Sequence, residues 1–184
     1  MKRLVESVYE APVVERDDGY RYLVHPVSNG LPTLEPQLIR EVVNGLVQTT
    51  ALESVDKIVS PVTMGIHVAA ALSLVTDIPL VVVRNREYGL PGEVAFESNG
   101  QTLYLNDVAS GDRVLVLDDL LSTGRSLAAV ADAVEGTGAE LVDLAVVIRR
   151  VDSEDALPER YDVRSLVDVR VGEDGVSVVD HLDW

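Results

Sequence analysis

Residues 114–127 read Val-Leu-Val-Leu-Asp-Asp-Leu-Leu-Ser-Thr-Gly-Arg-Ser-Leu, and this stretch decides the fold. Its first four residues are apolar and predict a buried strand, and two adjacent acids, Asp118 and Asp119, follow directly. Carboxylates at the end of a buried strand are costly to desolvate unless a partner meets them. Ribose hydroxyl groups and a hydrated Mg²⁺ are natural partners for such a pair. The stretch therefore predicts a site for a ribose or a magnesium ion.

The loop after the acids offers groups that bind phosphate. Ser122, Thr123 and Ser126 carry hydroxyl groups, and Gly124 allows a close backbone approach or a positive φ. A helix is expected to begin at Arg125, and the unpaired N–H groups of a helix N-terminus bind a phosphate monoester. The alternative is that the acids cap turns and the hydroxyl groups cap the helix. Capping accounts for one acid and one hydroxyl group, but not for the whole set.

An alternation of strands and helices surrounds this stretch. Strands are expected at 57–60, 79–84, 102–106, 113–117 and 141–148, and helices are expected from residue 33, over 65–76 and over 125–135. The first of these helices has an apolar face formed by Leu38, Val42, Leu46 and Val47. The order is typical of an α/β domain, with a mostly parallel central sheet flanked by helices. Ligands of such sheets bind beyond the carboxyl ends of the strands, so the site is expected at residues 60–65, 84–92 and 118–126.

Other segments give weaker signals. The β-branched residues in 79–84 predict a strand buried on both faces. Residues 85–100 contain three Gly and one Pro without a period and predict a long loop. The first 29 residues are poorly periodic, and residues 149–184 are expected to add short strands and turns at the edge of the sheet.

The composition excludes several classes of protein. The chain has 184 residues and an apolar fraction of 47%, which suits one domain with a continuous core. It has no cysteine, and therefore no disulfide, thiolate metal site or cysteine nucleophile. No apolar run approaches the roughly 20 residues of a membrane span. No signal-peptide pattern follows Lys2 and Arg3. We expect a soluble, cytoplasmic protein with no membrane partner.

The charge of the chain is strongly acidic, with 31 Asp and Glu against 15 Lys and Arg and a net charge of −16. Duplex binding needs clustered basic side chains, so no nucleic-acid partner is expected. The only lysines are Lys2 and Lys57. An acidic surface suffices for solubility alone, but the scarcity of lysine together with the excess of Asp favours adaptation to a salt-rich cytoplasm, where self-repulsion is screened.

The string Leu117-Asp-Asp-Leu-Leu-Ser-Thr-Gly-Arg-Ser126 resembles the phosphoribosyl-pyrophosphate (PRPP) signature of type I phosphoribosyltransferases. The resemblance implies that Asp118 and Asp119 hold the ribose 2′- and 3′-hydroxyl groups, and hold Mg²⁺ partly through water and PRPP. The resemblance also implies that Asp119 is a catalytic residue. It also implies that the 5′-phosphate is wrapped by Ser122, Thr123, Gly124, Arg125 and Ser126.

Further segments extend the resemblance over most of the chain. Val62-Thr-Met-Gly65 resembles the pyrophosphate-binding loop of the family, so Thr63, Met64 and Gly65 are expected to face the diphosphate, often across a cis peptide bond. Residues 84–93 resemble the basic strand end and flexible loop of adenine and archaeal hypoxanthine/guanine phosphoribosyltransferases, which implies that Arg84 and Arg86 contact pyrophosphate. The stretch His25-Pro-x-x-x-Gly-x-Pro32 also resembles the archaeal purine subgroup.

The chain departs from the family where the base binds. Bacterial and animal hypoxanthine/guanine enzymes carry an Asp at the position of Ser122 and use it to exchange a proton with base N7. Ser122 cannot take that role. Adenine-type enzymes have a small residue there and draw an acid from the mobile loop, which makes Glu93 and Glu97 the candidates here. The lysine that reads the 6-oxo group is also missing, and Arg149 or Arg150 either replaces it or is simply a charge at a strand end.

The resemblance implies purine salvage: transfer of the 5-phosphoribosyl group from PRPP to hypoxanthine, guanine or adenine, with Mg²⁺ as cofactor. One domain is expected over residues 1–184, with a core at about 33–150 and a hood from about 1–32 and 151–184. A homodimer is expected because the family is commonly dimeric. The alternatives are a non-catalytic PRPP- or nucleotide-binding regulator and an orotate or xanthine phosphoribosyltransferase.

Overall fold

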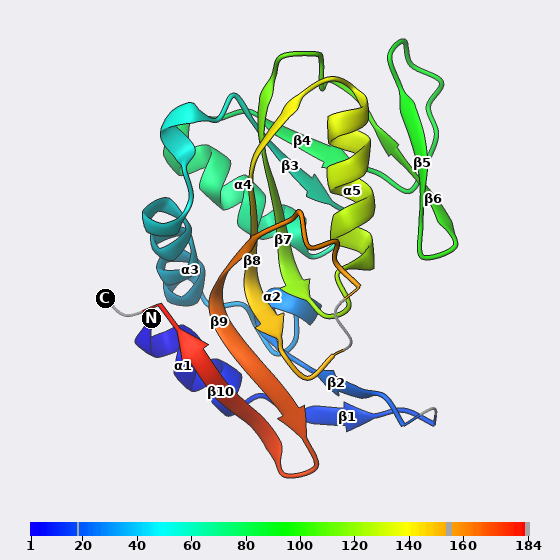
Figure 1. Cartoon of the computed structure of the whole chain (residues 1–184). Coiled ribbons are helices and arrows are strands. Elements are labelled where there is room, and N and C mark those ends of the chain that lie inside the picture. Colours follow the sequence, from blue (N-terminus) through cyan, green and yellow to red (C-terminus); the bar gives the residue numbers. More distant parts are fainter. Residues whose placement is uncertain (18, 154–155, 183–184) are drawn as a thin grey trace.

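The computed structural model of the chain describes residues 1–17, 19–153 and 156–182. Its centre is a six-stranded sheet with the strand order β10-β9-β8-β7-β3-β4 (Figure 1). The strands are β3 (Lys57–Pro61), β4 (Leu80–Val83), β7 (Arg113–Leu121), β8 (Glu140–Arg150), β9 (Val163–Gly172) and β10 (Gly175–His181). Neighbouring strands are parallel, except that β9 and β10 are antiparallel. The predicted α/β class with a mostly parallel sheet is confirmed.

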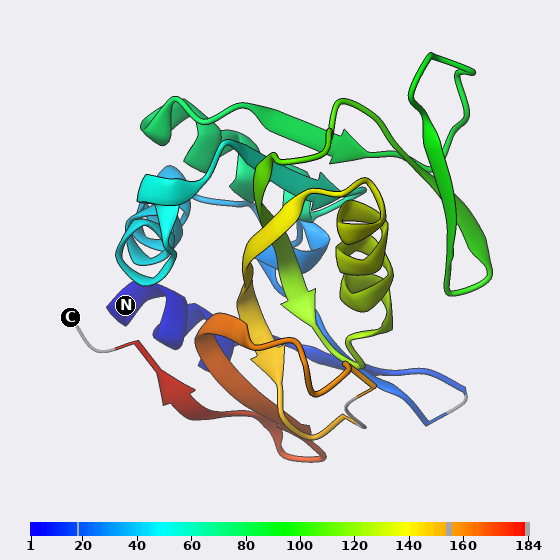
Figure 2. The same ribbon diagram turned by 45° about the horizontal axis from the view of Figure 1, so that its top comes forward.

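Helices cover both faces of the sheet (Figures 1 and 2). On one face lie α1 (Lys2–Tyr9), α3 (Pro36–Thr49) and α4 (Gly65–Thr76), and on the other lies α5 (Arg125–Gly136). Along β7, Leu115 and Leu117 join the first buried cluster, whereas Val114 and Val116 join the second. Successive side chains of a strand point to opposite faces, so an unbroken apolar run suits a strand covered on both sides.

Two antiparallel hairpins project from the body of the molecule (Figure 2). One consists of β5 (Val94–Ser98) and β6 (Gln101–Leu105), joined by Asn99 and Gly100, whose φ values of 50° and 75° suit a tight hairpin turn. The other consists of β1 (Val13–Glu15) and β2 (Arg21–Leu23), and α2 (Pro26–Asn29) follows it. A short 3₁₀ helix, η1 (Leu52–Ser54), precedes β3.

Three expectations from the sequence are wrong. Within the described chain, β4 is an edge strand of the sheet, and most of its residues are half-buried because one side lacks a neighbouring strand. Residues 85–100 do not form one loop, since β5 occupies Val94–Ser98. In α3, Val43 is buried and Val47 is 41% exposed, so the buried face is rotated from the predicted one.

The terminal segments are more regular than their weak periodicity indicates. α1 buries Leu4 and Val8 in the first cluster, beside α3 and β10. The Leu4 backbone N–H donates to Glu41 Oε1 of α3 at 2.9 Å, which fixes the start of the chain on the body. β9 and β10 extend the sheet, in agreement with the strands expected at its edge. None of the helices in the described ranges is both long and apolar enough to cross a membrane.

Candidate active site

Three loops leave the carboxyl ends of neighbouring parallel strands. β3 lies between β7 and β4 in the sheet, so the loops that follow these three strands open at the same edge. They are residues 62–64, 84–93 and 122–124. The fold therefore brings together the three segments that the sequence singles out.

The acid pair lies inside β7, because the strand continues beyond the predicted end to Leu121. Asp119 is 9% exposed and Asp118 is half-buried. The backbone N–H of Asp119 donates to Asp118 Oδ1 at 2.9 Å. Burial raises the pKa of both carboxyl groups, and the charge of Asp118 raises the pKa of Asp119 further. Two buried carboxyl groups side by side are costly to ionise together, and a bound cation would lower that cost.

The loop between β3 and α4 is packed against this pair. A Cβ atom on Gly65 would lie 2.6 Å from Ser60 Oγ and 2.7 Å from Asp118 Oδ1, so only glycine fits without displacing a neighbour. The Val62–Thr63 peptide bond is cis, as the resemblance implies, and Thr63 is exposed. The predicted pyrophosphate loop and the predicted ribose-binding acids thus form one contiguous surface.

The residues at this edge fit a magnesium ion that is shared with a substrate. Mg²⁺ is usually held by one or two carboxylates, with substrate oxygens and waters completing its shell. No group of three or more His, Asp or Glu side chains that would hold a metal occurs within the described ranges. Asp118 and Asp119 supply two carboxylates, and the buried Ser60 hydroxyl nearby has no hydrogen-bond partner in the described part of the chain.

The loop from Ser122 to Gly124 joins β7 to α5. Gly124 has a φ of 78° and is the N-cap of α5, and no side chain caps this helix. The capping alternative is therefore wrong for the hydroxyl groups of Ser122, Thr123 and Ser126. The first N–H groups of α5 and these hydroxyl groups remain a suitable set for an anion.

Neighbouring segments hold this loop from two sides. A Cβ atom on Gly124 would lie 2.8 Å from Leu157 Cβ, and the Ala156 N–H donates to Thr123 O at 2.9 Å. On the other side, Asn99 Nδ2 of the β5–β6 turn donates to Ser126 Oγ at 2.7 Å. The predicted phosphate-binding residue Arg125 is exposed at the start of α5.

Arg84 is held by the loop that follows it. Its guanidinium donates to Glu93 Oε2 at 3.0 Å, to Arg86 O at 2.9 Å and to the side chain of Asn106. Glu93 also accepts the Gly89 N–H at 2.9 Å. The hydrogen bond from Arg84 holds the pKa of Glu93 below its usual range. Glu93 is thus a carboxylate in contact with one of the two arginines that are predicted to bind pyrophosphate.

The other candidate acid is placed differently. Glu97 lies on β5, is exposed and accepts the Thr102 hydroxyl at 2.6 Å across the hairpin. Arg86 is exposed, with its guanidinium 5.7 Å from the centre of the Tyr88 ring. Of the two loop acids, Glu93 is the one that the structure brings to the predicted pyrophosphate-binding side chains.

Arg150 is engaged in contacts that its position at the end of β8 does not reveal. It is 7% exposed, forms an ion pair of 2.6 Å with Asp152, and donates to Tyr20 Oη at 2.9 Å and to Arg21 O at 2.7 Å. These partners occupy its guanidinium, so Arg150 does not suit the predicted base-binding role. Arg149 is half-buried and lines a pocket of about 320 Å³ with Leu121 and Leu157.

Two residues at the site, Tyr20 and Asn99, lie outside the three segments that the sequence singles out. Ser60 lies at the start of one of those segments, but the sequence assigns it no role. All three residues contact or border the predicted ligand-binding loops. The Asn-Gly pair at 99–100 is a known hairpin-turn signal, and it would have indicated the β5–β6 turn. Tyr20 gave no signal, because its role depends on contacts made only in the folded chain.

Comparison with known proteins identifies the family of the chain. The family model described as "Phosphoribosyl transferase domain" matches residues 33–181. HGPRTase-like protein 2 of Haloferax volcanii is 56% identical over 183 residues, covering 97% of this chain and 99% of that protein. The HGPRTase-like protein of Halobacterium salinarum is 50% identical over 184 residues, covering 98% and 97%. Both relatives come from halophiles, which agrees with the halophilic origin inferred from the acidic composition.

Solved structures share the fold. Adenine phosphoribosyltransferase from Thermoanaerobacter pseudethanolicus superposes with a TM-score of 0.73 at 24% identity, covering 91% of this chain and 99% of that one. Purine phosphoribosyltransferase from Pyrococcus horikoshii gives a TM-score of 0.53 at 21% identity, covering 72% and 85%. With the family match and the close relatives, the chain belongs to the phosphoribosyltransferase domain family.

Proposed function

We propose that this protein transfers the 5-phosphoribosyl group from PRPP to a purine base and releases pyrophosphate. One observation carries the proposal: the buried acid pair, the glycine loop packed on it and the uncapped start of α5 lie at one edge of the sheet. These features match the three parts of PRPP, namely ribose, diphosphate and 5′-phosphate. A single ligand then accounts for groups that are costly to bury unpaired.

The chain first holds the ribose 5-phosphate part of PRPP. Asp118 and Asp119 accept hydrogen bonds from the 2′- and 3′-hydroxyl groups, and Ser122–Ser126 bind the 5′-phosphate through hydroxyl and N–H groups. Both sets lie on β7 and the start of α5, which are well packed elements. Fixing both ends of the sugar orients its C1 atom, which lowers the entropic part of the barrier.

The diphosphate faces the N–H groups of residues 63–65, and Arg84 and Arg86 approach it from the next loop. For this, Arg84 leaves Glu93 and exchanges one anionic partner for another. Negative charge grows on the leaving diphosphate in the transition state, where these donors stabilise it most. Asp118 and Asp119, together with PRPP oxygens, would hold Mg²⁺, which would supply further positive charge for the diphosphate.

The bond changes need one proton acceptor. The bond from C1 to the diphosphate oxygen breaks and its electron pair stays with pyrophosphate, while a ring nitrogen of the base forms the new bond to C1 and loses its proton. Glu93 is ionised and becomes free when Arg84 turns to the diphosphate, so we assign it the role of accepting that proton. Glu97 is the second candidate, on the neighbouring hairpin.

The relatives favour hypoxanthine or guanine as the base, because they are named HGPRTase-like proteins. Adenine is the alternative, since Ser122 takes the place of the usual 6-oxopurine acid. Arg149 is the remaining candidate for reading the base. The same PRPP site would serve a non-catalytic PRPP sensor, or an orotate or xanthine phosphoribosyltransferase. Measuring the turnover of individual bases distinguishes these alternatives from a hypoxanthine/guanine or adenine enzyme.

The proposal includes the organisation of the molecule. We assign a core to about residues 33–150 and a hood to the described parts of 1–32 and 151–182, and we expect a homodimer that works in the cytoplasm. Size-exclusion chromatography with light scattering measures the oligomeric state. A monomeric mass at working concentration would overturn the dimer.

A screen of bases tests the function. The protein is incubated with PRPP and Mg²⁺ in molar KCl together with adenine, hypoxanthine, guanine, xanthine or orotate, and the nucleotide products are measured. We expect product from hypoxanthine or guanine. Turnover of orotate alone would overturn the purine assignment, and tight PRPP binding without turnover of any base would favour the sensor.

A further inference from the structure

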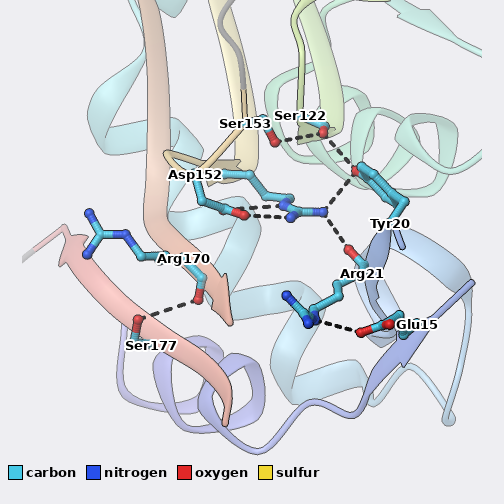
Figure 3. A network of polar contacts seen from close by, with 9 residues as sticks. Glu15, Tyr20, Arg21, Ser122, Asp152, Ser153, Arg170 and Ser177 are labelled. Atoms are coloured by element: carbon cyan, nitrogen blue, oxygen red, sulfur yellow. Dashed lines mark hydrogen bonds and ion pairs between the residues drawn. The ribbon is translucent and has the colours of Figure 1, made fainter. Parts of the chain in front are cut away.

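A partly buried chain of hydrogen bonds connects the β1–β2 hairpin to the predicted phosphate loop (Figure 3). Tyr20 Oη lies 2.9 Å from Ser122 Oγ, although the two residues are 102 positions apart in the sequence. Ser122 Oγ lies 3.1 Å from Ser153 Oγ, in the segment after β8. Three distant parts of the chain thus meet at the hydroxyl group of Ser122.

The hydrogen bond between Arg150 and Tyr20 has only one possible donor. Arg150 is only a donor, and it donates from Nη1 to Tyr20 Oη at 2.9 Å. Its other nitrogens are directed to Asp152, with Nη2 at 2.6 Å from Asp152 Oδ2. The guanidinium also lies 5.0 Å from the centre of the Tyr20 ring. Ion pair, hydrogen bond and ring contact together hold the Tyr20 oxygen as an acceptor.

The donor and acceptor roles in the next hydrogen bonds follow from this one. Because the Tyr20 oxygen accepts from Arg150, the Tyr20 proton is best placed toward Ser122 Oγ. Ser122 Oγ then accepts from Tyr20, and its own proton turns to Ser153 or to a ligand. The network borders an open pocket of about 360 Å³, whose lining includes Tyr20, Thr123, Arg150 and Ser153.

We propose that Tyr20 is a positioning residue that orients the Ser122 hydroxyl group as a hydrogen-bond donor to the 5′-phosphate of the substrate. A fully ionised phosphate has no proton to donate, so its oxygens can only accept hydrogen bonds. A hydroxyl group held as a donor therefore suits them. This inference deepens the proposed function and rests on it only in taking Ser122 as part of the ribose 5-phosphate site.

The chain offers a matched pair of substitutions. Tyr20→Phe removes the hydroxyl group but keeps the ring, which packs edge to face with the ring of Tyr22, with centroids 4.6 Å apart. Tyr22→Phe is the control, because its hydroxyl group accepts from Arg16 at 2.7 Å and lies outside the network of Ser122. Ser122→Ala and the double variant Tyr20→Phe/Ser122→Ala complete a cycle.

Calorimetry with the two halves of PRPP, ribose 5-phosphate and pyrophosphate, measures the effect without any base. Tyr20→Phe is expected to weaken ribose 5-phosphate binding about fivefold and to leave pyrophosphate binding unchanged, since one neutral hydrogen bond is typically worth about that factor. Ser122→Ala is expected to weaken ribose 5-phosphate binding similarly, and the double variant no more than Ser122→Ala alone. Tyr22→Phe is expected to bind both ligands as the unchanged protein does.

Four results would overturn the inference: ribose 5-phosphate binding unchanged in Tyr20→Phe, equal loss for both ligands, additive losses in the double variant, or no ribose 5-phosphate binding by the unchanged protein. The thermal melting temperature of each variant is measured in parallel. A Tyr20→Phe protein that melts earlier but binds normally would make Tyr20 purely structural and would also refute the inference. Because no base is present, the result is independent of whether a purine is turned over.

Discussion

Replacing Gly65 by Ala is expected to disrupt the PRPP site while the fold persists. The new Cβ atom would lie 2.6 Å from Ser60 Oγ and 2.7 Å from Asp118 Oδ1, where ordinary contact begins at 3.4 Å. The neighbours must therefore yield by about 0.8 Å (3.4 − 2.6) and 0.7 Å (3.4 − 2.7). The new Cβ atom would also lie 3.2 Å from Asp118 Cα, so the backbone of β7 is close to it as well as the side chain of Asp118. The strain falls on an acid that is assigned to the ribose.

Two magnitudes follow from this geometry. Overpacking a buried position typically costs about 1–3 kcal/mol of folding free energy, which a stable domain survives. A displaced Asp118 loses a charged hydrogen bond to the ribose, which is worth about 1.5–3 kcal/mol, or roughly 10- to 150-fold in PRPP affinity. Binding is therefore expected to suffer more visibly than the fold.

The assay is calorimetry of PRPP with Mg²⁺, with a thermal melt of the same sample. Gly136→Ala is the matched control, because Gly136 ends α5 and a Cβ atom there meets nothing within 4 Å. The control is expected to bind PRPP normally and to melt no lower than the unchanged protein. PRPP affinity of Gly65→Ala within twofold of that of the unchanged protein would refute the reasoning.

Three further predictions concern salt, pH and the loop acid. With a net charge of −16, the melting temperature is expected to rise from dilute to molar KCl, and a flat or falling trend would leave the acidity as ordinary solubility. Burial lowers the pKa of His25 to about 4 in the folded protein, against 6.5 in the unfolded chain. The neutral His25 side chain therefore contributes its full stability above pH 6.5, and this contribution is lost as the pH falls through 4. The free energy of unfolding should decrease by up to about 3 kcal/mol over this range. The stability difference between the unchanged protein and His25→Gln should therefore shrink as pH falls through this window, and a difference independent of pH would contradict it. Glu93→Gln is expected to lower kcat by about 10²–10⁴-fold in steady-state kinetics, and by more than Glu97→Gln does. A larger loss of kcat in Glu97→Gln would contradict the role of Glu93.

The local part of the fold and site could be predicted from the sequence. Strand β7, the loop after it and helix α5 follow from one continuous pattern, because apolar runs, turn residues and helix periodicity act over a few neighbouring residues. The acid pair was found for the same reason, although β7 extends past it. The family resemblance then supplied roles that the local pattern does not contain.

What remained hidden depends on partners far away in the sequence. The burial of β4 was overestimated because a strand's surroundings are set by its place in the sheet, which its own residues do not specify. Arg150 was assigned to the base because the sequence does not show that Asp152 and Tyr20 surround it. The contact between Tyr20 and Ser122 was missed for the same reason.

The most direct test of the central claim compares the unchanged protein with Asp118→Asn/Asp119→Asn, which keeps the shape of both side chains and removes their charge. Pyrophosphate and nucleoside monophosphate are measured together after PRPP, Mg²⁺ and hypoxanthine or guanine are added in molar KCl. The account predicts that the unchanged protein forms the two products in equal amounts and that the double variant loses at least about 100-fold of this activity, since two charged hydrogen bonds to the ribose are weakened. Equal activity of the two proteins, or pyrophosphate release without nucleotide formation, would contradict it.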